Sequence, residues 1–256
     1  MISRPFVPAV AVLCLLFAAG FPSGSRGIAA RGPAPVNRPQ QTVSPLAQEG
    51  RLIFASTPKY TSPWIGNTLS CADCHLQGGT VAYAAPLINV AKRYPSFSKR
   101  AGHIVTLEER IQECFVRSEN GKPIPADSTQ LKALAAYLRS LSGNGVPGRL
   151  YPGRRLVTLP ALRGNPARGK SLYAKKCAIC HQADGAGRPG AVPPLWGSNS
   201  FNHGAGMSHP AQLAAWVQPN MPKMHPGSLS AQQAFDIAAY VDSRPRPPFN
   251  PAYKNY

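Results

Sequence analysis

The sequence predicts an all-α protein built from two small helical domains in tandem. Three observations carry this prediction. The pentapeptide pattern Cys-X-X-Cys-His occurs twice, as CADCH at 71–75 and as CAICH at 177–181. Helix signals flank both copies in the same order. No run of residues alternates apolar and polar side chains for long enough to predict a sheet.

The helix signals before the two pentapeptides have the same form. Ser44 is suited to cap a helix that starts with Pro45, and Asn165 with Pro166 repeats this pair. Each position predicts the start of a short amino-terminal helix.

The helix signals after the pentapeptides share one core. DSTQLKALAAYLRSLSG at 127–143 matches SAQQAFDIAAYVDS at 230–243, where Ser230 and Gln233 form a capping box. Each segment carries an apolar stripe at helical spacing. The stripes consist of Leu131, Leu134, Ala135 and Leu138 in the first copy and of Phe235, Ala238, Ala239 and Val241 in the second.

The pentapeptides predict covalent haem attachment. Two thiols three residues apart on a helical turn suit the two vinyl groups of one haem, and the following histidine is then placed under the iron. Such a cysteine pair also occurs in redox centres, disulfides and zinc sites, but a zinc site would need further ligands at matching spacing, which are not visible. The haem-binding residues are therefore Cys71, Cys74 and His75 in the first copy and Cys177, Cys180 and His181 in the second.

Together these signals predict two cytochrome c domains, each with one covalently bound haem c. We expect the first at 31–145 and the second at 165–256. The segment between them, 146–164, is rich in Gly, Pro and Arg and is interpreted as a linker.

The first thirty residues have the pattern of a secretory signal peptide. Arg4 precedes an apolar run at 7–20 that is too short to span a bilayer, and small residues follow it. Cys14 lies in this run, and Leu13 before it is a poor fit to lipoprotein processing. We expect residues 1–30 to be removed, at a cleavage point that the sequence does not fix, and the mature protein to reside in the periplasm without a membrane span.

The chain is strongly basic, with 28 Lys and Arg against 10 Asp and Glu and a formal net charge of +18. Such a balance suits nucleic acid, anionic membranes, small anions or acidic partners. It also suits a solvated surface that offsets a bound anionic cofactor. Export argues against nucleic acid, so small anions and partner proteins remain.

The second domain offers several candidates for the iron ligand opposite His181. Met221 stands directly before a proline, as in the Met-Pro loop of many cytochromes c, and is the preferred ligand. Met224 and Lys223 are alternates, because methionine fills core gaps around haem as readily as it binds iron. Less favoured candidates are Met207, His203, His209 and His225.

The first domain has no methionine to offer its haem. The candidates for the position opposite its histidine are His103, Cys114 and a lysine, or the position stays open. Thr106 and Glu109 form a capping box, which predicts a helix over 107–117.

On that helix Arg110, Cys114 and Ser118 share one face, with Arg117 nearby. The arginines and an adjacent iron would keep Cys114 as thiolate. The alternative is an inert buried cysteine, which the missing methionine makes less attractive.

The chain resembles the dihaem thiosulfate dehydrogenases, some of which run as tetrathionate reductases. The segments that carry the resemblance are GNTLSCADCHLQGGT, YPSFSKRAGHIVTLEERIQECFVRSENGKPIP, PPLWGSNSFNHGAGM and NMP. It implies that the first haem, held by histidine and by Cys114, is the catalytic site, with Arg100, Arg110 and Ser118 beside it. It implies that the second haem carries electrons out, with Met221 as the matching ligand.

The resemblance implies an enzyme that joins two thiosulfate ions to tetrathionate and passes two electrons to a c-type cytochrome or another periplasmic acceptor. Arginine forks suit the two anions, and thiolate ligation lowers a haem potential relative to Met/His ligation. One alternative is a dihaem electron carrier without a substrate. Another is a different sulfur-oxidation cytochrome with Cys-ligated haem.

Overall fold

The computed structural model describes residues 43–142 and 153–256, which belong to one compact unit, Thr42–Tyr256. The predicted signal peptide and Cys14 lie outside the described residues, and so does the first part of the predicted linker. The boundaries of the two domains stay a prediction.

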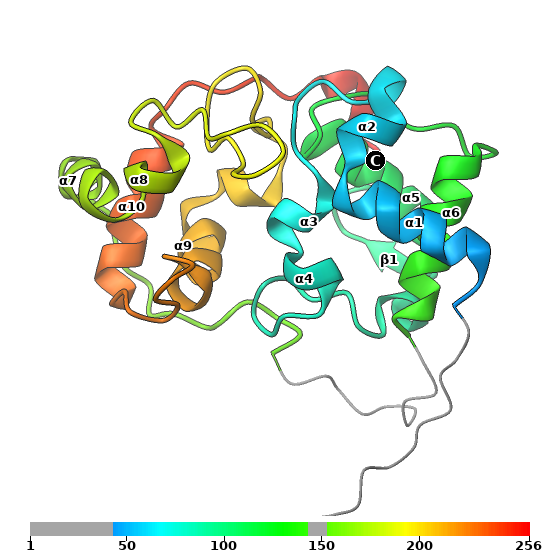
Figure 1. Cartoon of the computed structure of the whole chain (residues 1–256), viewed down its shortest axis with the longest axis horizontal. Helices are drawn as coiled ribbons and strands as arrows, with labels where there is room; N and C mark the ends of the chain where they lie inside the picture. The colour runs from blue at the N-terminus through cyan, green and yellow to red at the C-terminus, as the bar shows by residue number, and fades with distance from the viewer. Residues whose placement is uncertain (1–42, 143–152) are drawn as a thin grey trace, which may run out of the picture. The chain divides into compact units, whose positions relative to one another are not determined.

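Helices dominate the described residues, as the sequence predicts (Figure 1). The α-helices are α1 (Pro45–Ala55), α2 (Thr57–Thr61), α3 (Cys71–Cys74), α4 (Leu76–Gly79), α5 (Leu107–Arg117), α6 (Thr129–Ser140), α7 (Pro166–Lys176), α8 (Ala178–His181), α9 (Pro210–Asn220) and α10 (Ala231–Asp242). Single 3₁₀ turns are η1 (Ser62–Trp64), η2 (Val90–Arg93), η3 (Gly206–Ser208) and η4 (Pro251–Tyr253). No helix in the described ranges is long and apolar enough to cross a membrane.

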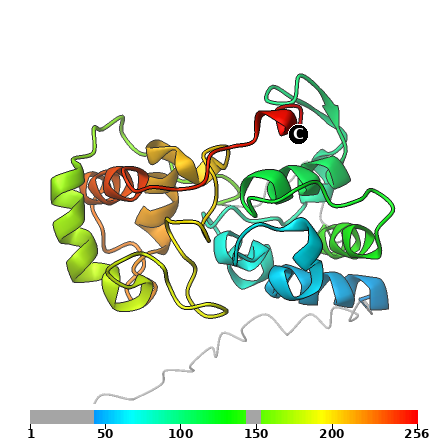
Figure 2. The same cartoon turned by 90° about the horizontal axis from the view of Figure 1, so that it is seen from above.

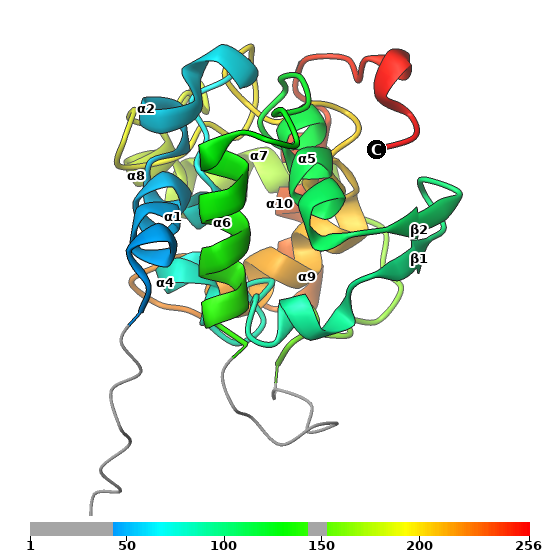
Figure 3. The same cartoon turned by 90° about the vertical axis from the view of Figure 1, so that its right-hand side faces the viewer.

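One small hairpin departs from the purely helical expectation. Strands β1 (Ser96–Ser98) and β2 (His103–Val105) pair antiparallel, with Phe97 opposite Ile104. Three residues per strand are too few to produce a detectable alternation in the sequence. The hairpin directly precedes α5 and lies at its amino-terminal end (Figure 3).

The predicted helix starts are confirmed. The side chains of Ser44, Asn165, Thr106 and Ser230 each accept a hydrogen bond from a backbone N–H of the first turn of α1, α7, α5 and α10. These caps satisfy amides that a helix start otherwise leaves without a partner. Ser128 caps α6 in the same way.

The amino- and carboxy-terminal helices of each repeat cross at a glycine (Figure 1). A Cβ on Gly50 of α1 would lie 1.9 Å from the carbonyl oxygen of Ala133 in α6. A Cβ on Gly169 of α7 would lie 1.9 Å from the carbonyl oxygen of Asp236 in α10. The repeat predicted from the pentapeptides therefore extends to the helix crossing, which requires glycine in both copies.

We expect Gly50→Ala to destabilise the protein by about 3 kcal/mol, because the added methyl group forces α1 away from α6. The decrease would be measured as a lower thermal unfolding midpoint of the haem-loaded protein. Glu49→Ala, an exposed change on the same helix, is the control. Equal midpoints for the two variants would show that the crossing tolerates a wider separation.

Two large apolar clusters form most of the core, and a small third one consists of Leu69, Phe201 and Ala205. Of the two large clusters, one gathers α1, α5 and α6 around Phe54, Phe115 and Leu134, and the other gathers α7, α9 and α10 around Tyr173, Trp216 and Phe235. The predicted stripes are buried except at Ala239, which is half-buried. The helix α9 was not predicted, because its apolar residues surround it instead of forming one stripe.

The described part of the predicted linker packs against the folded core. Leu156, Leu159 and Leu162 contact the second cluster. The amide of Tyr83 donates a 2.7 Å hydrogen bond to the carbonyl oxygen of Gly153. This stretch is therefore a structural part of the compact unit and not a free spacer.

The segment after α10 returns to the first repeat (Figure 2). The Arg117 guanidinium of α5 donates to the carbonyl oxygen of Tyr256 at 2.8 Å and lies 4.3 Å from the ring centroid of Phe249. The side-chain amide of Asn202 donates to the carbonyl oxygen of Val116 at 2.9 Å. The carboxy-terminal end of α5 is thus held by residues of the second repeat.

Candidate active site

The first pentapeptide occupies one wall of a cavity. Ser70 and Asp73 form a capping box that starts α3 at Cys71. The short helix then presents Cys71, Cys74 and the following His75 to the same cavity. The sequence-predicted haem-binding residues of the first copy are therefore brought together.

The His75 ring is held in one orientation. Its Nδ1 lies 2.6 Å from the carbonyl oxygen of Ala85, so Nδ1 carries the proton and Nε2 is left as the free lone-pair nitrogen. Burial lowers the pKa of His75 to about 4. A neutral imidazole with a fixed tautomer is the form that binds a metal.

The remaining walls fit a haem. Apolar side chains dominate them, and Cys114 lines the cavity together with His75. The lining includes Phe54, Leu87, Leu107, Ile111, Leu134 and Leu138. Two thiols, a neutral histidine and an apolar cleft are the donor set and the surroundings that c-type haem requires.

Cys114 projects from α5, which runs beside α6 (Figure 3). The Arg110 Nη1 donates a 3.0 Å hydrogen bond to Cys114 Sγ. Cys114 is the largest cause that raises the pKa of Arg110, ahead of Glu113. The competing ligand His103 is exposed on β2 and does not line the cavity. No lysine among the described residues lines it either.

The other predicted polar residues have different positions. Ser118 lines the cavity one turn after Cys114. Arg100 does not line it, and its guanidinium instead pairs with the carboxylate of Glu113. Arg110, Cys114 and Ser118 thus line the same cavity. Arg100 is connected to Arg110 through the carboxylate of Glu113, which pairs with both arginines.

Several residues of this cavity were missed by sequence reasoning. Arg93, Tyr94 and Arg154 line it, and Arg154 comes from the segment interpreted as a linker. Glu119 also lines it, with a buried side chain whose Oε2 has no hydrogen-bond partner among the described residues. Burial, and then Asp73, raise the pKa of Glu119. No spacing signal connects these residues to the pentapeptide.

The second pentapeptide forms a similar cavity. Cys177, Cys180 and His181 line it, and His181 Nδ1 lies 3.0 Å from the carbonyl oxygen of Pro193. Burial lowers the pKa of His181. The orientation of the histidine by a carbonyl is therefore repeated, and the donor set again fits a haem.

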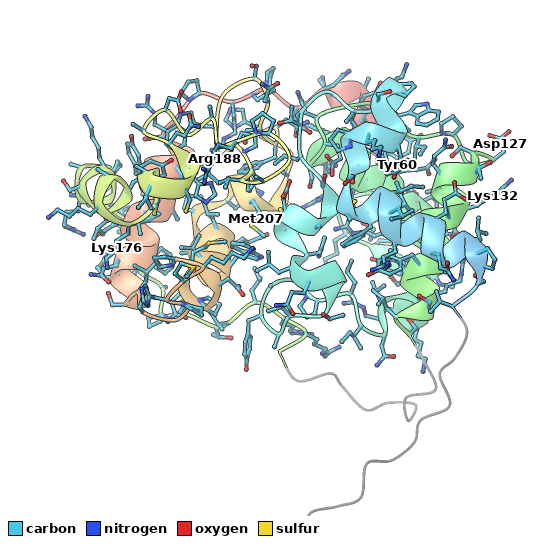
Figure 4. All side chains as sticks on the ribbon, in the orientation of Figure 1. Tyr60, Asp127, Lys132, Lys176, Arg188 and Met207 are labelled. Atoms are coloured by element: carbon cyan, nitrogen blue, oxygen red, sulfur yellow. The ribbon has the colours of Figure 1, made fainter. Side chains whose placement is uncertain are left out.

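Three of the ligand candidates line the second cavity: Met221, Lys223 and Met207. Met207, labelled in Figure 4, packs against the cluster of Leu69, Phe201 and Ala205. Met224 is 82% exposed and does not line this cavity. His203, His209 and His225 do not line it either. Met221, Lys223 and Met207 therefore remain as candidates for the second iron ligand. Met221 is the C-cap of α9.

The two cavities adjoin each other. Leu69 and Cys74 line both of them. Trp216 of α9 lines the second cavity and donates from Nε1 to the carbonyl oxygen of Cys74 at 3.0 Å. The back of the first pentapeptide is thus a wall of the second site.

Comparison with family models assigns both halves to cytochromes. The description "SoxA/TsdA, cytochrome c domain" matches residues 57–147. The description "Cytochrome C oxidase, cbb3-type, subunit III" matches residues 164–241.

Curated proteins named thiosulfate dehydrogenase are similar to most of the chain. The one from Stutzerimonas stutzeri (strain A1501) is 40% identical over 82% of this chain and 70% of its own length. The one from Allochromatium vinosum is 39% identical over 85% of this chain and 84% of its own length.

A solved structure has the same fold. The thiosulfate dehydrogenase (TsdBA) from Marichromatium purpuratum, in its "as isolated" form, superimposes with a TM-score of 0.72 at 32% sequence identity. The match covers 82% of this chain and 48% of the solved chain, so the present chain corresponds to about half of that protein.

Proposed function

The chain belongs to the thiosulfate dehydrogenase family and binds haem c covalently, and on this basis we propose that it oxidises thiosulfate in the Cys114 cavity. Joining two thiosulfate ions forms one sulfur–sulfur bond and releases two electrons. Bound haem c supplies a one-electron acceptor in each cavity. The observation that carries the proposal is the hydrogen bond from Arg110 to Cys114 Sγ, in the same cavity as His75.

We assign His75 and Cys114 as the ligands of the first iron and His181 and Met221 as those of the second. Covalent attachment is assigned to the cysteine pairs Cys71/Cys74 and Cys177/Cys180. Support comes from the lining of the two cavities and from the fixed Nδ1 of each histidine. Lys223 and Met207 are the remaining alternates on the second side, since Met224 is exposed and does not line the cavity.

Cationic side chains favour the approach of two dianions. Arg110, Arg93 and Arg154 line the first cavity, and Arg guanidinium forks bind oxyanions with two parallel hydrogen bonds. Ser118 adds a hydroxyl donor at the same wall. These side chains offset the repulsion that the two substrates exert on each other before the sulfur–sulfur bond forms.

Electrons leave through the second site in this proposal. The shared residues Leu69 and Cys74 and the bond from Trp216 place the second cavity directly behind the first. We further propose a periplasmic location and a c-type cytochrome as the acceptor. The basic chain suits an acidic partner of this kind.

We expect Arg110→Gln to lower kcat/KM for thiosulfate by about 10- to 100-fold, because a charge-assisted donor at the cavity is lost. The measurement is thiosulfate oxidation by haem-loaded protein with an artificial electron acceptor. Arg139→Gln is the matched control, because Arg139 also pairs with a glutamate of α5 but does not line the cavity. Native-like kinetics of Arg110→Gln would remove the arginine from the proposed site.

A further inference from the structure

The carboxylate of Glu113 is paired with arginines beside the candidate site. Glu113, directly before Cys114, is 7% exposed. A buried carboxylate repels a dianionic substrate and costs desolvation energy, so its position beside an anion site needs a cause. Neither the sequence reasoning nor the proposed function uses this residue.

The two oxygens of the Glu113 carboxylate face three arginines. Oε1 pairs with Arg100 and lies 3.4 Å from Arg117 Nε, while Oε2 lies 3.3 Å from Arg110 Nη1. The same Arg110 Nη1 donates to Cys114 Sγ. Glu113 therefore connects the guanidinium that contacts the sulfur with the guanidinium that lies outside the cavity lining.

The third arginine, Arg117, is itself anchored by backbone carbonyls. The Arg117 side chain is 8% exposed and is held by the carbonyl oxygens of Gly204 and Tyr256, at 3.3 and 2.8 Å. By comparison, the side chains of Arg100 and Arg110 are 40% and 39% exposed. The cluster thus has one buried, anchored cation and two cations whose side chains are less buried.

We propose that Glu113 is a positioning residue for the thiosulfate site: it holds Arg110 against Cys114 and Arg100 at the edge of the cavity. The inference rests on the proposed function for its substrate. Long arginine side chains lose considerable rotamer freedom when they are fixed, and an ion pair made in advance removes that cost from substrate binding. Glu113 contributes through the arginines and does not itself contact the substrate.

A positioning role and a simple charge-balancing role of Glu113 predict opposite changes in thiosulfate binding when the residue is replaced by glutamine. If Glu113 only offset positive charge, Glu113→Gln would raise the local positive potential and tighten the binding of a dianion. If it positions the arginines, Gln weakens binding, because its NH₂ group faces a guanidinium and only its oxygen still accepts. The direction of the change in KM therefore separates the two roles.

The test compares Glu113→Gln and Glu113→Asp with the native haem-loaded protein. We expect KM for thiosulfate to rise about tenfold in the Gln variant with a smaller change in kcat, as for loss of one partner in a buried ion pair. The Asp variant keeps the charge but has a shorter reach, and we expect a raised KM there too. Glu108→Gln, which breaks the α5 pair with Arg139, is the matched control. A lower or native KM in both Glu113 variants would overturn the proposal.

A second readout needs no turnover and so separates failure of this inference from failure of the proposed function. Hydrogen bonds to a ligand sulfur raise a haem potential, so losing the Arg110 contact lowers the potential of the haem that Cys114 holds. Mere removal of a negative charge raises it. We expect a lower potential of that haem in Glu113→Gln by spectroelectrochemical titration, and a higher one would overturn the proposal.

Discussion

Replacing Cys114 by alanine is expected to abolish thiosulfate-dependent electron release while both haem groups stay attached. The sulfur lines the cavity with His75 and receives the hydrogen bond of Arg110. Without it the first cavity loses both the proposed iron ligand and the hydrogen-bond partner of Arg110. We expect turnover to fall by a factor on the order of 1,000, as for removal of a group that acts directly at the reacting centre.

The measurement is the rate of artificial-acceptor reduction by purified haem-loaded protein, with haem content determined on the same samples. Cys114→Ser is the companion variant, because it keeps a polar side chain of similar size without the thiolate. Both variants should retain the native haem content, since Cys114 lies outside the two pentapeptides. Turnover within tenfold of the native rate in either variant would argue against Cys114 at the catalytic centre.

Removing the first pair of attachment cysteines is expected to have the second large effect. The double variant Cys71→Ala, Cys74→Ala should lose one covalent haem and with it the cooperative unfolding of the first repeat. The reason is that α1, α5 and α6 direct apolar side chains into the cavity, so their core is incomplete without the cofactor. Thr57 would also lose its 3.4 Å contact with Cys71 Sγ.

The matched control is the same change in the second copy, Cys177→Ala with Cys180→Ala. Intact-mass measurement should show the loss of one haem in each double variant, and calorimetry should show which repeat loses its transition. We expect both variants to lose turnover with an external acceptor. Two haems still attached after removal of either pair would contradict the assignment of the pentapeptides.

Local signals in the sequence account for the part of the fold that was predicted. The caps at Ser44, Thr106 and Ser230 act on the next few residues, so their effect is visible in the sequence itself. The apolar stripe of 127–143 is likewise read from neighbouring turns of one helix. The hairpin was missed because each of its strands has only three residues.

Helical spacing accounts for the predicted shared face of three residues of the candidate site. Arg110 and Cys114 lie four apart on α5, and Ser118, four residues later, is its C-cap. Arg154 and the carbonyl partner of His75 come from loops whose paths depend on the whole packing. Glu113 lies next to Cys114 in the sequence, yet its three arginine partners include Arg100, which approaches through the hairpin turn.

The linker was interpreted from its composition, and composition describes local chain preference rather than contacts. Its described part, 153–164, contains no helix. Its leucines nevertheless pack on the second core, and Arg154 reaches the first cavity. These contacts join residues that are distant in the sequence, and no pattern within the segment encodes them.

The most direct test of the proposed function is the product stoichiometry of the native, haem-loaded protein. Thiosulfate and an artificial electron acceptor are supplied, and the electrons transferred and the tetrathionate formed are both counted. We predict two electrons for each tetrathionate, with the reverse reaction measured in a parallel assay with tetrathionate and an electron donor. A protein whose haems are reduced and oxidised normally but that neither forms nor consumes tetrathionate would contradict the proposed function and identify an electron carrier.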